Sequence, residues 1–119
     1  MREKDYENKI KKFIESVGGW WVKFHGNAFT RDGVPDLLCC VNGYFLAIEV
    51  KGDGGEPSKL QLHEITKIDE AGGIALVSYP DEFEELKHLI GGLLWRCLIL
   101  GFQLLISVLI STSLDMLKS

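Results

Sequence analysis

The middle of the sequence contains three charged residues whose types could act together in catalysis, Asp36, Glu49 and Lys51. Asp36 stands at the start of one apolar run, and Glu49 and Lys51 stand at the end of the next, with Asn42-Gly43 between the two runs. This dipeptide is the strongest short signal of a two-residue β-hairpin turn. Pairing across the turn would bring Asp36 beside Glu49. Because side chains alternate along a strand, Glu49 and Lys51 would point to the same face.

Two neighbouring carboxylates repel each other unless a cation lies between them, and Mg²⁺ takes oxygen ligands from one or two carboxylates together with water and phosphate. Protonated Lys51 cannot be a ligand, but its ammonium group could orient an attacking water or stabilise charge on a phosphate. The alternative is a surface hairpin with an ordinary Glu/Lys pair. The strand that holds Glu49 is apolar enough to be central in a sheet, where a charged residue is unusual. We therefore predict that Asp36 and Glu49 bind a metal ion.

A wider set of residues resembles the PD-(D/E)xK nuclease superfamily, and in particular its small stand-alone VRR-NUC proteins of phages and bacteria. The matching motifs are Gly33-x-Pro35-Asp36, Glu49-Val50-Lys51 and Ser58-x-x-Gln61, within residues 5 to about 80. The resemblance implies a restriction-endonuclease-like core and a DNA endonuclease that depends on Mg²⁺, with Mn²⁺ as an alternative. It also implies a homodimer that acts on branched DNA in the manner of Holliday-junction resolvases.

The same resemblance adds three residues to the site. It implies that the first helix supplies an acidic ligand, for which Glu7 is the match and Glu3, one turn earlier, is the rival. It also implies that Gln61 orients groups of the site, although Ser58 and Gln61 have the spacing of a helix capping box, which would explain both residues without a catalytic role. We add the backbone carbonyl of Val50 as a further metal ligand.

The polar segment 25–33 leads into Asp36, and loops beside a site commonly carry binding groups. We predict contacts to DNA phosphates from His25, Asn27 and Arg31, together with Lys23 and Ser58. A solvated loop histidine is an equally good interpretation of His25.

Charge is the property that suits DNA binding least. The chain holds 13 basic and 17 acidic residues, for a net charge of −4, and an acidic chain repels a polyanion at long range. The first helix and the loop before Asp36 are locally basic through Lys9, Lys11, Lys12, Lys23 and Arg31. These side chains could face DNA, or those of the helix could merely solvate its outer face.

The elements that must position these residues follow from periodicity and turn signals. Tyr6, Ile10, Phe13, Ile14 and Val17 recur at the spacing of an amphipathic helix. Glycine pairs end this helix and a later one. The expected elements are a helix over 6–17, strands over 20–24, 37–41, 44–50 and 74–79, a helix over 58–71 and a further helix capped by Asp81. This order predicts one α/β domain over residues 1–90, with a mixed sheet flanked by helices.

The three cysteines, Cys39, Cys40 and Cys97, lack the spacing of a zinc site. Adjacent residues on a strand point to opposite faces, so Cys39 and Cys40 are not expected to act together. We interpret all three as small buried apolar residues of a cytoplasmic protein. The polar, charged start of the chain does not resemble a signal peptide.

Residues 91–119 differ sharply from the rest, because 97–114 contains no charged residue. Leu98, Phe102, Leu105 and Leu109 are spaced to pack on the domain or on a partner subunit, as a dimerisation helix would. The run also reaches the lower length limit of a membrane helix, with Trp95-Arg96 at an interface, although Gln103 and several serines oppose this. An altered reading frame is the third interpretation.

Two further functions remain open. The chain could be a non-catalytic DNA-binding or assembly module with the same fold, tethered to a membrane by its tail. It could also be a nuclease that restricts foreign DNA and is targeted by another chain. Junction binding that is unaffected by Mg²⁺ and by the loss of Glu49 would favour the non-catalytic module. Junction selectivity of the isolated protein would argue against the nuclease that another chain targets.

Overall fold

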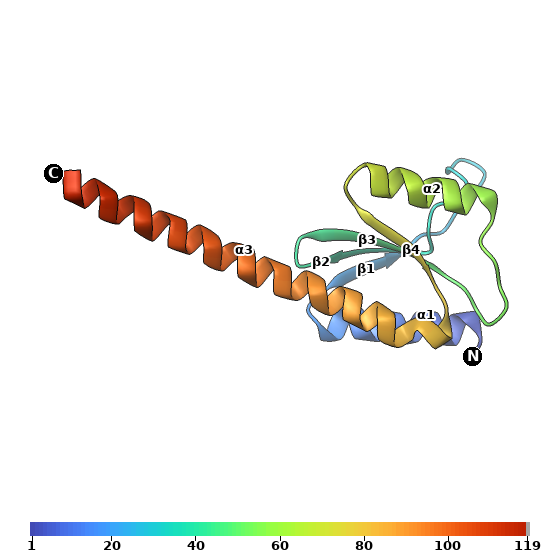
Figure 1. The fold of residues 1–119 in the computed structure, drawn as a ribbon. Coiled ribbons are helices and arrows are strands. Elements are labelled where there is room, and N and C mark those ends of the chain that lie inside the picture. Colours follow the sequence, from blue (N-terminus) through green and yellow to red (C-terminus); the bar gives the residue numbers. More distant parts are fainter. Residues whose placement is uncertain (119) are drawn as a thin grey trace.

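The computed structural model describes residues 1–118, except for the side chains of 96–102. Four strands and three α-helices follow one another along the chain in the order expected from the sequence (Figure 1). The elements are α1 (Glu3–Ser16), β1 (Trp20–Lys23), β2 (Leu37–Val41), β3 (Tyr44–Val50), α2 (Lys59–Glu70), β4 (Ile74–Ser78), a 3₁₀ turn (Pro80–Glu82) and α3 (Phe83–Lys118). The prediction of an α/β chain with a mixed sheet is confirmed.

The four strands form one sheet in the order β1-β2-β3-β4. β2 is antiparallel to both β1 and β3, and β4 runs parallel to β3. Asn42 and Gly43 form the turn between β2 and β3 with φ values of 52° and 85°, as a two-residue hairpin turn with both central residues at positive φ requires. The register pairs Leu37 with Ile48. One residue further along, Asp36 therefore lies opposite Glu49.

Helices cover both faces of the sheet. Figure 1 shows α1 and the first part of α3 on one face and α2 on the other. The core lies under α1 and α3 and is made of Tyr6, Ile10, Ile14, Leu37, Cys39, Val41, Leu46, Ile48, Val50, Leu86 and Ile90. Each fully buried aliphatic side chain of this kind contributes about 1.5–3 kcal/mol relative to exposure. This packing holds the hairpin in place.

Alternation along β3 separates two environments. Leu46, Ile48 and Val50 belong to the core under α1, whereas Glu49 points to the opposite face, where a residue of α2 contacts it. Glu49 is 1% exposed. The sheet therefore buries a carboxyl group beneath α2, at the end of the hairpin that Asp36 also occupies.

Cys39 and Cys40 lie on opposite faces of β2, as predicted. Cys39 is buried in the core, and burial raises the pKa of its thiol to about 12. Cys40 is exposed, so the prediction that it is buried is wrong. Its face of the sheet is covered by α2, which packs on β3 and β4 rather than on β2. The side chain of Cys97 lies outside the described residues.

The last helix differs from the expected one in its start and its length. Residues 80–82 form a 3₁₀ turn with Tyr79 at its N-cap position, so Asp81 is not the cap. Residues 83–118 then form one helix. The packed part reaches Leu94, which follows the buried Leu93 and contacts the core, and the side-chain amide of Asn42 lies 3.3 Å from the carbonyl oxygens of Leu93 and Leu94.

Beyond this point α3 projects away from the domain (Figure 1), and the molecule extends 66 × 29 × 19 Å. Leu105 is 56% exposed and Leu109 is 58% exposed. Leu105 and Leu109 therefore do not pack on the domain of their own chain, and the side chains of Leu98 and Phe102 lie outside the described residues. Among the described residues, no helix combines the length and the apolar character that crossing a membrane requires.

Candidate active site

Asp36 is held from both neighbouring strands at the end of the sheet. Its side-chain Oδ2 accepts a hydrogen bond of 3.0 Å from the amide of Val50, and its carbonyl oxygen accepts one of 2.8 Å from the amide of Phe24. The first bond crosses to β3 and the second to the end of β1. The Asp36 side chain remains 23% exposed. It is therefore a positioned carboxylate that solvent can still reach.

Glu49 lies beside Asp36 and is fully enclosed. Its Oε1 accepts a hydrogen bond of 2.9 Å from Nε2 of Gln61 and lies 3.3 Å from Nζ of Lys51. In the described part of the chain, nothing donates a hydrogen bond to its Oε2. Burial and then the neighbouring Asp36 raise the pKa of Glu49 to about 7, against the opposing effect of Lys51. The structure thus brings Asp36, Glu49, Lys51 and Gln61 together.

Gln61 performs two tasks with one amide group. Its Oε1 accepts from the amide of Ser58 at 2.8 Å, and Oγ of Ser58 accepts from the amide of Gln61 at 3.1 Å, which together form the predicted capping box. The Nε2 of the same side chain donates to Glu49. The cap fixes the helix start, and with it the donor that faces Glu49.

Gly33 sets the distance between the loop and this helix start, a role that the sequence did not reveal. Its φ is +87°, and a Cβ atom there would lie 2.4 Å from the carbonyl oxygen of Leu60. Only glycine combines this backbone conformation with such a close approach. The motif spacing had marked Gly33, but a contact between residues so far apart in the chain leaves no local signal.

Glu7 lies on the α1 side of the sheet and is already paired. Its Oε1 is 2.5 Å from Nζ of Lys23, and its Oε2 is 2.9 Å from Nζ of Lys11. Burial opposes ionisation of Glu7, but the two lysines outweigh it, and the pKa of Glu7 is lowered. Lys23 also lies 3.4 Å from Oδ1 of Asp36. Glu7 is therefore connected to Asp36 through Lys23.

The residues predicted to contact DNA occupy different positions. Lys23 points inward to Glu7 and Asp36, and Ser58 is the cap of α2. Asn27 supports its own loop, where its Oδ1 accepts from the amide of Phe29 at 2.8 Å. Arg31 is exposed and lies 3.4 Å from Glu64 of α2, and His25 is exposed. Of these five residues, only His25 makes no polar contact with another described residue.

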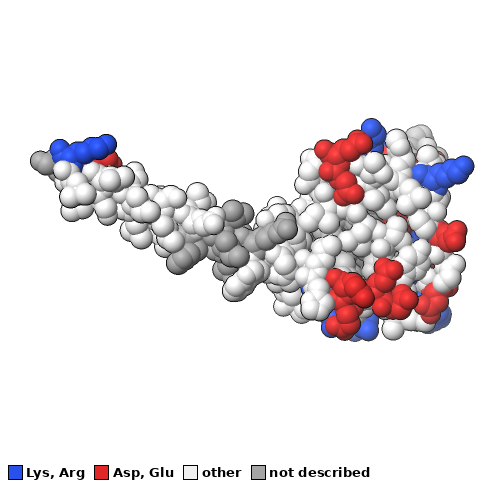
Figure 2. Space-filling model, viewed as in Figure 1, with Lys and Arg blue, Asp and Glu red and all other residues white. Residues whose placement is uncertain are grey.

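Several lysines of the locally basic region are engaged in internal contacts. Lys11 and Lys23 pair with Glu7, and Nζ of Lys9 lies 4.5 Å from the ring centre of Phe83. The face in Figure 2 shows acidic side chains over the start of α3 and over α2, with basic side chains beside them, and residues 103–114 of the projecting helix carry no charge. That face of the domain is not suited to a polyanion.

No model of a known protein family matches this chain. No curated protein matches it either. The assignment of function therefore depends on the geometry of the site.

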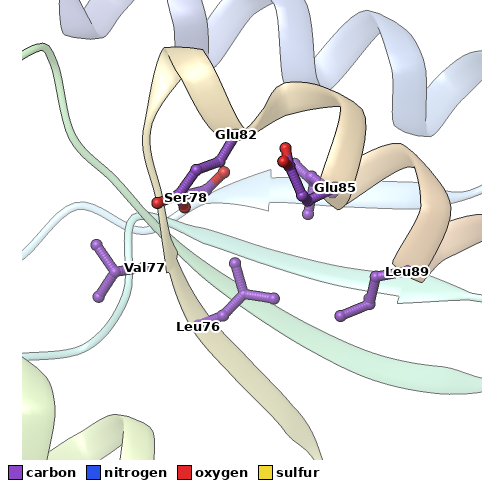
Figure 3. A pocket seen from close by; sticks show the side chains of 7 residues that line it. Leu76, Val77, Ser78, Glu82, Glu85 and Leu89 are labelled. Carbon is purple, nitrogen blue, oxygen red and sulfur yellow. The ribbon is translucent and has the colours of Figure 1, made fainter.

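A hollow of about 160 Å³ lies between β4 and the start of α3 (Figure 3). Apolar side chains form most of its wall, and Glu82 and Glu85 border it. Its hydroxyl group, on Ser78, lies 2.6 Å from the hydroxyl of Tyr6 and is thus engaged. The predicted site residues do not line this hollow, and its acidic border carries no arrangement for catalysis.

The carboxylate oxygens of the site decide whether a metal ion fits there. Within residues 1–118, no group of three or more His, Cys, Asp and Glu side chains is arranged around a common ion position. Asp36 and Glu49 form a pair, however, and the buried Oε2 of Glu49 has no donor among the described residues. A buried carboxylate oxygen next to a second carboxyl group needs a proton or a cation. Since Mg²⁺ binds through one or two carboxylates and several waters, the donor set fits such an ion.

Proposed function

We propose that this chain is a metal-dependent DNA endonuclease of the PD-(D/E)xK type, with a restriction-endonuclease-like core, and that it resembles VRR-NUC proteins. One observation carries the proposal: a buried carboxylate on Glu49 lies beside Asp36, with one oxygen lacking a donor in the described structure and the other held by Lys51 and Gln61. A carboxylate whose pKa is raised by burial and by a neighbouring carboxyl group is typical of catalytic sites.

In this proposal Asp36, Glu49 and the carbonyl of Val50 hold Mg²⁺ or Mn²⁺. The ion would polarise the phosphate and lower the pKa of a bound water, so that a nucleophile exists near neutral pH. Strand geometry supports the carbonyl, because the N–H and C=O groups of one residue face the same neighbouring strand. The amide of Val50 faces Asp36, and so its carbonyl faces the same side, beyond the end of β2.

Lys51 and Gln61 act on the same group from two sides. The ammonium of Lys51, held 3.3 Å from Glu49, lies where it can orient the attacking water or stabilise negative charge that develops on the phosphate. Gln61 fixes the rotamer of Glu49 through its hydrogen bond. Glu7 acts at a distance in this scheme, since it anchors Lys23 next to Asp36.

The test is a nuclease assay on four-way, flapped and linear DNA with Mg²⁺. We expect the native protein to cleave branched DNA and both Asp36→Asn and Lys51→Met to lose at least about a hundredfold in rate. Lys67→Met is the matched control, because among the described residues Lys67 pairs only with Glu70, on the exposed face of α2. Equal background cleavage by all four proteins would refute the catalytic proposal.

A non-catalytic DNA-binding role is the second candidate. It is favoured by the ion pairs, because Lys11, Lys23 and Lys51 already lie next to the carboxylates of the site. In that case junction binding would be unaffected by Mg²⁺ and by Glu49→Gln. A nuclease would instead bind its substrate more tightly with the ion and lose that gain in the variant.

We also propose that the protein forms a homodimer through the projecting part of α3. The spacing of Leu98, Phe102, Leu105 and Leu109 continues to Thr112 and Met116 in alternating steps of four and three, the seam of a two-stranded coiled coil. Leu105 and Leu109 are exposed in the single chain. Light scattering should give a dimer for the native protein and a monomer for Leu105→Gln/Leu109→Gln. A dimer in both proteins would contradict this seam, and Ser107→Gln is the matched control on the polar side.

A further inference from the structure

Lys23 occupies a central position among the carboxylates of the site. Its ammonium group lies between Oε1 of Glu7, at 2.5 Å, and Oδ1 of Asp36, at 3.4 Å. It reaches this position from the last residue of β1, and 27% of its side chain is exposed. A lysine ammonium is positively charged near neutral pH, so the group places a positive charge between two acidic residues.

The partners of each carboxylate oxygen show where a metal ion can bind. Both oxygens of Glu7 are paired with lysines, and Oδ1 of Asp36 faces Lys23. Oδ2 of Asp36 accepts one hydrogen bond, from Val50, and keeps a free lone pair. Oε2 of Glu49 receives no hydrogen bond within the described part of the protein. The available oxygens thus lie on the Glu49 side of Asp36.

Two-metal sites hold their ions about 3.5–4 Å apart, usually with a carboxylate that bridges them. In this chain Asp36 is the residue that could bridge, with Glu49 on one side and Glu7 on the other. The ammonium of Lys23 already takes the Glu7 side. A second divalent ion would have to displace it or accept strong repulsion from it.

We propose that Lys23 takes the place of a second cation, so that the site binds a single divalent ion between Asp36 and Glu49 and Glu7 is not a ligand. This inference rests on the proposed function, because it assumes that Asp36 and Glu49 bind a metal. Lys23 is then a positioning residue, which occupies the Glu7 side of Asp36 and restricts the number of ions.

Calorimetric titration of the full chain with Mn²⁺ alone, without DNA, tests this inference. The native protein should bind one ion per chain. Lys23→Met removes the charge but keeps a side chain of similar length, so it frees Glu7 and Asp36 for a second ion, and we expect two ions per chain. Lys11→Met is the matched control: it removes the other lysine from Glu7, leaves Lys23 in place and should still bind one ion.

The possible outcomes separate this inference from the proposed function. Two ions in the native protein, or one ion in a folded Lys23→Met protein, would overturn the role of Lys23 while leaving the metal site intact. No Mn²⁺ binding by the native protein would refute the metal site itself, and the inference with it.

Glu7→Gln covers the case in which Lys23→Met does not fold. If Glu7 is not a ligand, this variant should bind one ion with an affinity that changes less than about tenfold. A greater loss of affinity would make Glu7 a ligand and overturn the inference.

Discussion

Two buried glutamates face opposite sides of the same sheet, and their surroundings differ in one respect. Glu7, on the α1 side, has an ammonium group at each carboxylate oxygen. Glu49, on the α2 side, has Lys51 and Gln61 at one oxygen and no donor from the described residues at the other. As a result the pKa of Glu7 is lowered, whereas burial and Asp36 raise the pKa of Glu49 to about 7.

The difference shows that burial alone does not mark a functional carboxylate. Glu7 and Glu49 are 8% and 1% exposed, yet only Glu49 is left with an unmet demand for a proton or a cation. A buried carboxylate with partners at both oxygens can contribute to the stability of the fold. One with an unpaired oxygen carries an unfavourable desolvation free energy, which a bound cation would offset. Asp36 stands between them, linked to Glu7 through Lys23 and adjacent to Glu49.

Glu49→Gln tests the difference between the two glutamates most directly. The amide keeps the shape of the side chain but cannot bind a divalent ion well, so we expect cleavage to fall by at least about a hundredfold. The metal-free variant should nevertheless be more stable than the native protein at pH 8, because it removes a buried negative charge. Nuclease assays and thermal unfolding of the same preparations check both effects. A destabilised variant at pH 8 would show that the charge on Glu49 is already satisfied in the native protein.

The pH dependence of stability follows from the same pKa. The pKa of Glu49 is higher in the folded protein than in the unfolded chain, where it is near 4.5. Folding therefore favours the protonated form, and this contribution is complete below the unfolded value and lost as the pH rises through about 7. The loss is on the order of 3 kcal/mol for the metal-free protein.

Urea unfolding between pH 4.5 and 8 measures this loss. Glu49→Gln should flatten the profile over this interval, and Mn²⁺ should reverse the decline in the native protein by binding the ionised form. An unchanged profile in Glu49→Gln would assign the pH dependence to another group.

Gly33→Ala tests the close contact between the loop and the start of α2, from which Gln61 donates its hydrogen bond to Glu49. The new Cβ would meet the backbone of Leu60, and the positive φ of residue 33 would be strained. We expect a loss of stability of about 2–3 kcal/mol and a weaker bond between Gln61 and Glu49. The free energy of unfolding and the nuclease activity should decrease together. Gly54→Ala has the same positive φ but no close neighbour among the described atoms, and it isolates the contribution of strain.

The parts of the site that could be predicted depend on local signals. The Asn42-Gly43 turn and strand alternation predicted that Asp36 and Glu49 lie side by side, and the spacing of Ser58 and Gln61 predicted the capping box. Both are confirmed. These features depend on residues that are close along the chain or joined by one turn, so their geometry follows from backbone rules.

The remainder depends on how distant elements pack. The position of Lys23 between Glu7 and Asp36 requires the end of β1, the start of β2 and one face of α1 to meet, and no spacing in the sequence encodes that. The exposure of Cys40 follows from the position of α2 over β3 and β4. The spacing of Lys9 and Lys11 likewise did not show that they contact Phe83 and Glu7 in the fold. From the sequence alone, both charges could have faced DNA.

Glu7→Gln provides the reverse of the first variant and the smallest effect. Removing this carboxylate leaves Lys11 and Lys23 without their shared partner, although Lys23 keeps Asp36, so we expect a loss of about 1–2 kcal/mol near neutral pH. The folded pKa of Glu7 is lowered, and its contribution is therefore present above the unfolded value and lost as the pH falls through the folded one. The deficit of the variant should shrink in acid, below the range in which Glu49→Gln acts. If both variants altered stability over the same pH interval, the two glutamates would titrate as one group, and the contrast between a paired and an incompletely paired carboxylate would not hold.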